Sequence, residues 1–348
     1  MERNHLLYGP GRNSFENRQK IKCSYITHYS DYYSNKMKNY TADSFNIIKQ
    51  AGAAGQLRSA AFLEVCFFNY FSGFSSENTS GLVRMLEQEK ISYSLSFLDM
   101  QQTENVNEIC SAFPGMRILL PLGARHFSDS INLFFKESRS EYLLFLPCEM
   151  QVQKFNLPRI FSMMQHNLPG GAIPLVCDAE NKPVATIYAP ALEHKRFFLS
   201  KGEFRPGLLT LLPYKLAFLC KKEHFIGSGF NNIFSNMLVA ILDVFYRLYS
   251  RGKCIVAADS FIVKENNTAA RFNEFRAEAH GKSDLELFYY KNITDHDLEN
   301  GFFSAFLSVL AAGGSFKKLI KLHAEKSDTK NSRVLCDRDI LELFKKNA

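Results

Sequence analysis

The feature that most constrains the fold is an alternation of short apolar runs with amphipathic segments over residues 61–146. Short apolar runs bounded by polar stretches are typical of buried strands, whereas apolar residues three or four positions apart indicate helices. The predicted strands are residues 61–68, 93–98, 117–121 and 142–146, and the predicted helices are 80–89, 103–112 and 128–138. Repeated succession of strand and helix predicts an α/β fold with a mostly parallel central sheet flanked by helices.

Beyond residue 150 the regular alternation of predicted strands and helices ends. The predicted elements are a helix at 158–166, a hairpin of 172–177 with 183–188, a strand at 216–220, a helix at 234–249 and a strand at 254–258 that closes the sheet. The rest reads as helices at 284–291, 297–310, 316–325 and 337–346, with a linker at 326–331. We therefore divide the chain into an N-terminal extension (1–57), a domain that carries the sheet (58–270) and a C-terminal helical region (271–348).

Composition narrows the class of protein. A chain of 348 residues with 46% hydrophobic and 22% charged residues is globular, which excludes global disorder. The net charge of +7 reflects either compositional bias or attraction to phosphates or an anionic membrane surface. No nucleic-acid-binding motif accompanies that charge, so we expect no nucleic-acid partner.

Cysteine usage and the termini bear on localisation. The eight cysteines are widely spaced, without a CxxC pair or a zinc-type cluster, and predict reduced thiols of a cytosolic protein. The first residues lack the apolar core of a signal peptide, and no segment is apolar enough to span a bilayer. We expect a cytoplasmic protein that at most lies peripherally on the inner face of the membrane.

Two acidic residues follow predicted strands directly. Asp99 comes after residues 93–98, and Glu149 follows residues 142–146 and the pair Pro147-Cys148. In open α/β sheets ligands bind outside the carboxyl ends of the strands. Asp99 and Glu149 are therefore candidates for contact with a nucleotide or its metal.

Several short motifs follow one another over residues 61–291 in a recognisable order. They are VCFFN ending in Asn69, FLDM around Asp99, Ala124-Arg125-His126-Phe127 with Asn132, EYLLFL before Pro147-Cys148-Glu149, Gly229-Phe230, the helix segment from Asp243 to Leu248 followed by Gly252, and LFYYK at 287–291. In order and spacing this series resembles the family 2 inverting glycosyltransferases of the GT-A fold. The resemblance implies that residues 58–270 form a GT-A-like catalytic domain.

The resemblance implies a nucleotide-diphosphate sugar as donor. Asp99 would accept a hydrogen bond from the nucleobase, and Asn69, Arg125 and Asn132 would also bind the nucleotide. The family's Asp-x-Asp metal element falls on Pro147, Cys148 and Glu149, of which only Glu149 can ligate Mg²⁺ or Mn²⁺. Metal-independence is the alternative.

Without a metal, basic side chains would neutralise the diphosphate. Lys264 lies where the family often has a metal-assisting histidine, so it is a candidate for diphosphate binding. Further sources of positive charge are Arg125, Lys221 and Lys222.

An inverting transfer also needs a general base, normally a carboxylate on the acceptor-side helix. By resemblance that position falls near Ala240-Ile241, which cannot accept a proton, and Asp243 is the nearest acid. Asp243 is either the catalytic base or a buried acid paired with Arg247 one turn further on.

The C-terminal segment 302–322 combines mostly apolar residues with lysines. It is either an interfacial segment that lies on a membrane and meets a lipid-linked acceptor, or a helix packed on the core or on a second subunit of a homo-oligomer.

We therefore predict a glycosyltransferase that moves a sugar from a nucleotide-diphosphate sugar to a glycan, lipid-linked or protein acceptor with inversion. The alternative is a catalytically inactive protein of the same fold that acts as a binding or scaffold partner. A nucleotidyltransferase fits less well, because a Gly-rich phosphate loop after the first strand is missing: residues 70–81 contain only Gly73 and Gly81.

Overall fold

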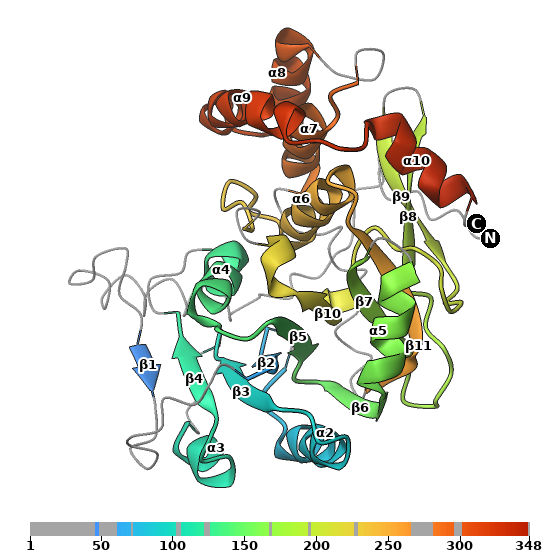
Figure 1. Ribbon diagram of the computed structural model, residues 1–348. Coiled ribbons are helices and arrows are strands. Elements are labelled where there is room, and N and C mark those ends of the chain that lie inside the picture. The colour runs from blue at the N-terminus through green and yellow to red at the C-terminus, as the bar shows by residue number, and fades with distance from the viewer. Residues whose placement is uncertain are drawn as a thin grey trace, which may run out of the picture.

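The structure is a computed structural model (Figure 1). It describes residues 46–48, 61–70, 72–101, 106–121, 126–166, 169–193, 196–225, 229–265, 281–295 and 301–346.

A nine-stranded sheet forms the centre of the described molecule, with strand order β1-β4-β3-β2-β5-β10-β7-β11-β6. The strands are β1 (Asn46–Ile48), β2 (Leu63–Phe68), β3 (Tyr93–Leu98), β4 (Arg117–Leu120), β5 (Tyr142–Pro147), β6 (Met150–Phe155), β7 (Pro169–Cys177), β10 (Phe218–Lys221) and β11 (Cys254–Glu265). Strands β2, β3, β4, β5, β7 and β11 run in one direction, while β1, β10 and β6 run in the other. The predicted α/β fold with a mostly parallel sheet is confirmed.

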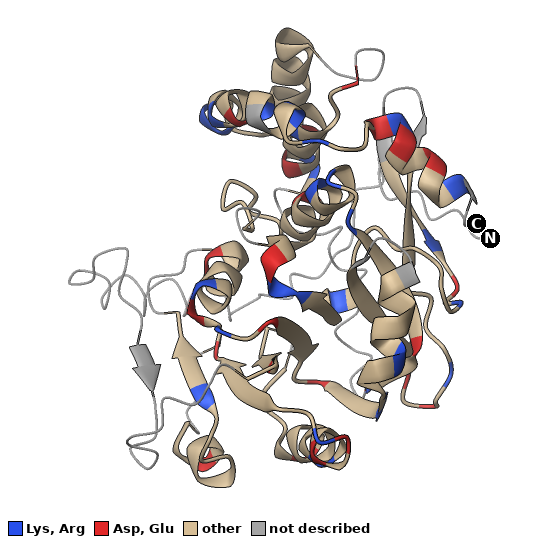
Figure 2. Cartoon of the chain, viewed as in Figure 1, with Lys and Arg blue, Asp and Glu red and all other residues tan. Residues whose placement is uncertain are grey.

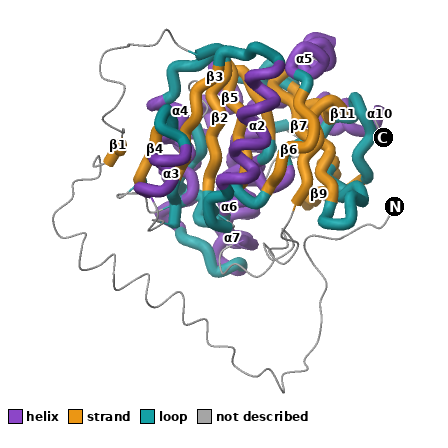
Figure 3. Tube along the Cα trace, turned by 90° about the horizontal axis from the view of Figure 1, so that it is seen from below, coloured by secondary structure: helices purple, strands orange, loops and turns teal. Residues whose placement is uncertain are grey.

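Helices cover both faces of this sheet. They are α2 (Ser76–Gln88), α3 (Val106–Ala112), α4 (Phe127–Glu137), α5 (Leu157–His166) and α6 (Met237–Ser250). Helices α2 and α3 lie on one face, and α4 and α6 lie on the other (Figures 1 and 3). All six residues of β2 are buried, as expected for a strand covered on both faces.

The C-terminal region is helical, as predicted, with α7 (Gly281–Asn292), α8 (Phe302–Ala311), α9 (Phe316–Asn331) and α10 (Asp337–Lys346). Helix α7 contacts α6, and α8 and α9 pack on α7. Helix α10 contacts β8 (Ile187–Glu193), which pairs with β9 (Arg196–Gly202) in a separate two-stranded sheet. None of the helices in the described ranges is long and apolar enough to cross a membrane.

The order of the strands creates a switch point between β2 and β5. From β2 the chain proceeds through β3 to β4 on one side, and then returns to place β5 on the other side of β2. The crevice outside the carboxyl ends of the strands at such a point is the usual ligand site of open α/β sheets. We call this side of the sheet the carboxyl edge.

Three local predictions differ from the structure. The predicted hairpin forms only at its turn: Cys177 and Pro183 make an antiparallel bridge, and the Val184 N–H donates to the carbonyl of Val176 at 2.8 Å, whereas residues 187 and 188 belong to β8, which pairs with β9 instead of β7. Residues 326–331 are part of α9 rather than a linker. The strand predicted at 254–258 continues to Glu265, and the sheet extends beyond it to β6, which had no predicted counterpart.

The N-terminal extension falls mostly outside the described residues. Its described part, β1, pairs antiparallel with β4 and so joins the sheet. The proposed division at residues 57 and 270 stays a prediction.

Candidate functional site

The ends of β2 and β3 are joined by one asparagine. Asn69 follows β2, and its Nδ2 donates to Oδ1 of Asp99 at 2.7 Å. Its Oδ1 accepts from the backbone N–H of Met100 at 2.6 Å. Both Asn69 and Asp99 are buried. The Asn69 amide therefore fixes the position of the Asp99 carboxylate at the carboxyl edge, next to the switch point.

Glu149 lies in the tight turn between β5 and β6, on the other side of the switch point. It is buried, and Ser72 donates to its Oε2 at 3.3 Å. The preceding residue, Cys148, donates its N–H to the carbonyl of Phe68 at 3.0 Å and accepts at its own carbonyl from Asn78. The turn is thus fastened to the end of β2, beside Asn69.

The two acids lie near the same thiol. Burial raises the pKa of Cys148 well above its ordinary value, and the charges of Glu149 and Asp99 raise it further. Glu149 and Asp99 therefore lie close to the same part of the carboxyl edge, as expected because β3 and β5 are the two neighbours of β2.

A lysine that the sequence did not indicate occupies the centre of this edge. Strand β10 is antiparallel to β5, so the residues before β10 lie at the carboxyl edge of the parallel strands. Nζ of Lys215 lies 3.2 Å from Oε1 of Glu149 and also donates to Oε1 of Glu265, the last residue of β11. The hydroxyl of Tyr214 donates to the other oxygen of Glu265 at 3.0 Å. We call Glu149, Lys215, Glu265 and Tyr214 the lysine cluster.

The backbone at Lys215 is strained. Lys215 has φ 48° and ψ 28°, and Leu216 has φ 60°, both in the left-handed region. Each such non-glycine residue costs on the order of 1–3 kcal/mol, and residues of this kind concentrate at functional sites. The strain aims a fully buried ammonium between two buried carboxylates.

The electrostatics of the lysine cluster are those of a buried ion group with one cation and two anions. Burial raises the pKa of the Glu149 carboxyl, and the Lys215 ammonium opposes that rise. Removal of one partner from such a group leaves an uncompensated buried charge, which costs about 3–5 kcal/mol. Lys215 is therefore the residue on which the local structure depends.

The residues around Glu149 do not fit a divalent metal. One carboxylate oxygen of Glu149 faces the Lys215 ammonium and the other accepts from Ser72. A cation beside Glu149 would meet the positive charge of Lys215 at close range, which is repulsive in a buried site. Within the described ranges, no group of three or more His, Cys, Asp and Glu side chains is arranged to hold a metal ion.

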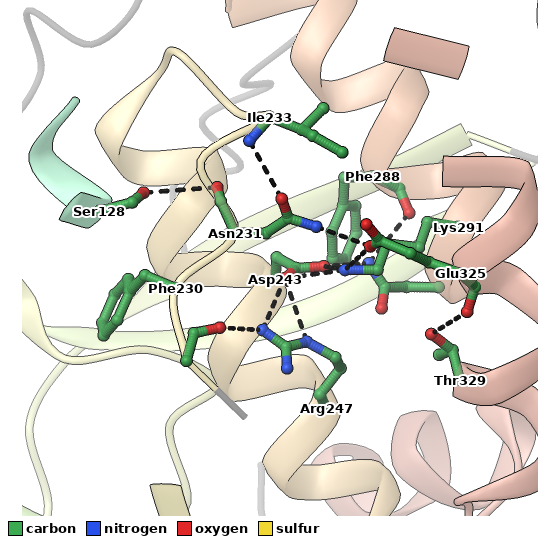
Figure 4. Close-up of polar contacts among 12 residues, drawn as sticks. Ser128, Phe230, Asn231, Ile233, Asp243, Arg247, Phe288, Lys291, Glu325 and Thr329 are labelled. Atoms are coloured by element: carbon green, nitrogen blue, oxygen red, sulfur yellow. Dashed lines mark hydrogen bonds and ion pairs between the residues drawn. The ribbon is translucent and has the colours of Figure 1, made fainter. Parts of the chain in front are cut away.

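Asp243 lies on α6 at the centre of a second ion cluster (Figure 4). It is fully buried, and Arg247 donates to its Oδ2 at 2.9 Å while Lys291 donates to its Oδ1 at 3.0 Å. Asn292 adds a third donor at 2.8 Å. Burial acts to raise the pKa of Asp243, yet Arg247 and Lys291 outweigh it and lower that pKa. The pairing with Arg247 expected as one alternative is present.

The same cluster reaches the C-terminal helices. Lys291 of α7 also lies 3.6 Å from Glu325 of α9, and Asn231 donates to Glu325 at 2.8 Å. Arg247 donates to the carbonyl of Gly229 at 2.8 Å. We call Asp243, Arg247, Lys291 and Glu325 the helix cluster, because it joins α6, α7 and α9 (Figure 4).

Asn132 contacts backbone rather than the carboxyl ends of β2 and β5. From α4 its Nδ2 donates to the carbonyl of Phe230, and its Oδ1 accepts the Phe230 N–H, both at 2.7 Å. A Cβ at Gly229 would lie 2.9 Å from that same Oδ1. The Gly229-Phe230 pair is thus held by α4, and the absence of a side chain at Gly229 permits it.

The basic residues proposed for a diphosphate lie in different places. Arg125 lies outside the described residues. Lys264 lies near the carboxyl end of β11, but successive strand residues point to opposite faces, so it lies on the other face from Glu265.

Lys221 and Lys222 are not at the carboxyl edge. Lys221 is opposite Tyr142, the first residue of β5, and Lys222 donates to the carbonyl of Ser138. They were wrong candidates, because an antiparallel β10 carries its last residues to the opposite edge of the sheet.

Sequence reasoning also missed an aromatic contact beside the site. The ring of Tyr70, next to Asn69, packs edge-on against Phe127 at 5.3 Å, and Phe127 packs against Phe230 at 6.1 Å. These rings connect the end of β2 with the start of α4 and the Gly229-Phe230 pair. Their signal in the sequence is weak, since phenylalanine is abundant throughout this chain.

No family model matches the sequence, and no curated protein matches it. Among solved structures the chain is similar to the crystal structure of GalNAc-T7 with UDP, GalNAc and Mn²⁺, with a TM-score of 0.46 and 11% sequence identity. The similarity covers 79% of this chain and 58% of that chain. A likeness of this size identifies neither a family nor a reaction, and membership of family 2 stays a prediction.

Proposed function

We propose that the chain binds a nucleotide-diphosphate sugar at the carboxyl edge of β2, β3 and β5, and that it serves glycosyl transfer with inversion. One observation carries the proposal: Asp99, held by Asn69, and Glu149, held by Lys215, flank the switch point of the sheet. Buried carboxylates fixed by dedicated partners at this point are typical of a ligand site. The sequence resemblance to family 2 glycosyltransferases supplies the chemical class of the ligand.

In this proposal Asp99 accepts a hydrogen bond from the nucleobase, and Asn69 positions its carboxylate. Arg125 and Lys264 stay candidates for the diphosphate, and Tyr70 and Phe127 provide apolar surface beside the base. Glycan, lipid-linked and protein acceptors all stay open as the class of acceptor.

The proposed binding does not use a divalent metal. The Lys215 ammonium already pairs with Glu149, and a metal at Glu149 would have to displace it. We therefore expect binding that is indifferent to chelators.

A second candidate function is binding without transfer. It is favoured by the geometry of Asp243, whose carboxylate is buried and bonded to Arg247, Lys291 and Asn292. A base must reach the acceptor hydroxyl and hold a pKa near the working pH, whereas the pKa of Asp243 is lowered.

Calorimetric titration with UDP, GDP and their sugars, with Mn²⁺ and with EDTA, tests the binding proposal. We expect binding of equal strength under both conditions. Hydrogen bonds to charged groups contribute about 1.5–3 kcal/mol, so Asp99→Ala should weaken binding roughly 10- to 150-fold. Asn69→Ala should weaken it less. The matched control is Glu141→Gln, an exposed acid at the opposite end of β5.

Wild-type protein that binds none of these nucleotides contradicts the proposal, as does a folded Asp99→Ala variant with unchanged affinity. Binding that appears only with Mn²⁺ contradicts the metal-free version. Donor hydrolysis or transfer by the wild type, measured by nucleotide release, separates the transferase from the second candidate.

A further inference from the structure

Helices α8 and α9 expose an unusual number of large apolar side chains. Phe303, Leu307, Leu310, Phe316 and Ile320 are between 42% and 71% exposed. In a soluble protein, exposed apolar side chains gathered in one place mark an interaction surface, whereas scattered ones do not. The five side chains lie on two helices that pack against each other, with the ring of Phe316 on α9 against that of Phe306 on α8 at 5.1 Å, and we call them the α8–α9 patch.

The patch results from the helical repeat of both helices. Phe303, Leu307 and Leu310 share one face of α8 at spacings of four and three residues, while Ala305 and Val309 on the other face are buried. On α9, Phe316 and Ile320 are exposed, while Leu319 and Leu322 are buried. One apolar face of each helix is therefore buried against the rest of the protein, and a second group of apolar side chains is exposed.

Lysines border the patch, and acids are absent from it. Residues 301–324 contain Lys317, Lys318 and Lys321 but no Asp or Glu. Lys317 and Lys321 are exposed, whereas Lys318 pairs with Asp284 at 3.3 Å. Figure 2 shows an uncharged α8 beside the basic residues of α9, on a part of the molecule that projects away from the sheet. This combination of apolar side chains and lysines fits an anionic bilayer surface.

The charge also disfavours a second copy of the chain as the occupant. In a two-fold symmetric contact the same patch meets itself, so the lysines of one copy would face those of the other. Helix α8 is too short to span a bilayer, because its ten residues extend about 15 Å, half of the hydrocarbon thickness. A helix of this length lies in the interface.

The patch is rigidly attached to the rest of the protein. Glu325 on α9 bonds to Asn231 and lies 3.6 Å from Lys291, which in turn contacts Asp243 of α6. Lys318 is bonded to Asp284 of α7 and to Ser235. A partner surface that binds α9 would therefore also set the orientation of α6 relative to that surface.

From these observations we propose that the α8–α9 patch docks the protein on an anionic lipid bilayer, with the apolar side chains inserted at the headgroup level and the lysines against the headgroups. The proposal does not depend on the proposed nucleotide site.

Flotation of the full chain with phosphatidylcholine vesicles containing 30% phosphatidylglycerol tests it, with pure phosphatidylcholine vesicles as reference. The wild type should float with the anionic vesicles, more weakly in 0.5 M salt, and not with neutral ones. Two lysines near an anionic surface contribute enough that Lys317→Gln with Lys321→Gln should weaken binding about 30-fold. Phe303→Ser with Leu307→Ser should abolish it. The control is Val334→Ser, an exposed apolar residue outside the patch.

Circular dichroism establishes that each variant is folded, and sedimentation velocity reports its oligomeric state. Unchanged flotation of the Phe303→Ser, Leu307→Ser variant overturns the proposal, and so does equal binding to neutral and anionic vesicles. A dimeric wild type that becomes monomeric in this variant, without vesicle binding, also overturns it and assigns the patch to a second copy. Nucleotide affinity should be the same in all of these variants.

Discussion

Lys215 combines a buried ammonium with a backbone conformation that non-glycine residues rarely adopt. The chain accepts that strain because two carboxylates, Glu149 in the β5–β6 turn and Glu265 at the end of β11, approach the same point. Each carboxylate would be costly to bury alone, since a buried charge without a partner loses its hydration. The ammonium makes it possible for both to stay inside the folded protein.

We expect Lys215→Met to destabilise the protein by about 3–5 kcal/mol at pH 7.5, because two buried anions are left without their cation. The loss should depend on pH. Burial already raises the pKa of Glu149 in the folded state, and removal of the ammonium raises it further. An acid with a raised folded-state pKa is destabilising when ionised, so the deficit should shrink as the pH falls toward the ordinary glutamate value.

Urea unfolding at pH 7.5 and pH 5.0 measures this difference. The control is Lys154→Met, which removes an exposed lysine from β6 and should change stability little. An equal loss at both pH values would show that the lost packing of the lysine side chain, rather than its charge, is responsible.

The sequence indicated part of this site. Asp99 and Glu149 follow apolar strands, and that local pattern is sufficient to place them at the carboxyl edge. Lys215 is far from both in sequence, and only the antiparallel pairing of β10 with β5 brings it to Glu149. Glu265 was missed because the strand was predicted to end at residue 258. In the structure the register of β11 with β7 shifts between Ala258 and Ile262, and the strand then continues.

At the scale of elements, the ends of some helices and strands were predicted correctly from the local sequence pattern. The predicted strand at 93–98 and the predicted helix at 337–346 coincide with β3 and α10. Strand β6 was missed because it is an outer strand of the sheet with two exposed polar residues, Gln153 and Lys154, so its sequence MQVQKF has no continuous apolar run. The last turns of α9 were taken for a linker because their residues are almost all polar.

Close approach of two strands at a glycine yields a prediction at this scale. A Cβ at Gly171 of β7 would lie 2.5 Å from the carbonyl oxygen of Leu219 in β10. Gly171→Ala must therefore separate the strands, at a cost of about 1–3 kcal/mol, as for other overpacked sites. Gly81 of α2 has open space around its Cβ position, so Gly81→Ala should stabilise the helix by about 0.5–1 kcal/mol.

Chemical unfolding of the two variants and the wild type measures whether Gly171→Ala lowers the free energy of unfolding and Gly81→Ala raises it. Equal effects of the two substitutions would contradict the prediction, since the same added methyl group should act in opposite directions at the two sites.

For the whole molecule, the helix cluster is a buried connection between the C-terminal helices and the α/β part, and we expect it to couple their unfolding. Asp243 is the shared partner of α6 and α7, and Lys291 extends the contact to α9. Buried ion pairs of this kind are strongly destabilising when one member is removed. Cooperative unfolding of the two regions should therefore depend on a few side chains.

We expect Asp243→Asn to cost about 3–5 kcal/mol at pH 7, because Arg247 and Lys291 lose their buried counter-charge. The pKa of Asp243 is lowered in the folded state, so its contribution is present above the ordinary aspartate value and is lost as the pH falls through the lower one. The difference in the free energy of unfolding between variant and wild type should thus narrow below about pH 4. Chemical unfolding followed by far-UV and near-UV circular dichroism measures this free energy.

Glu342→Gln provides the control, because Glu342 forms an exposed helical ion pair with Lys345. Such pairs contribute about 0–1 kcal/mol. An Asp243→Asn variant of unchanged stability that has lost sugar transfer would instead identify Asp243 as the base.

The positive charge at Lys215 is covalently part of the polypeptide. It arrives with translation, one per molecule, and neither chelation nor dilution can remove it. The charge balance of the lysine cluster is therefore set by the amino-acid sequence rather than by the supply of ions in the surroundings.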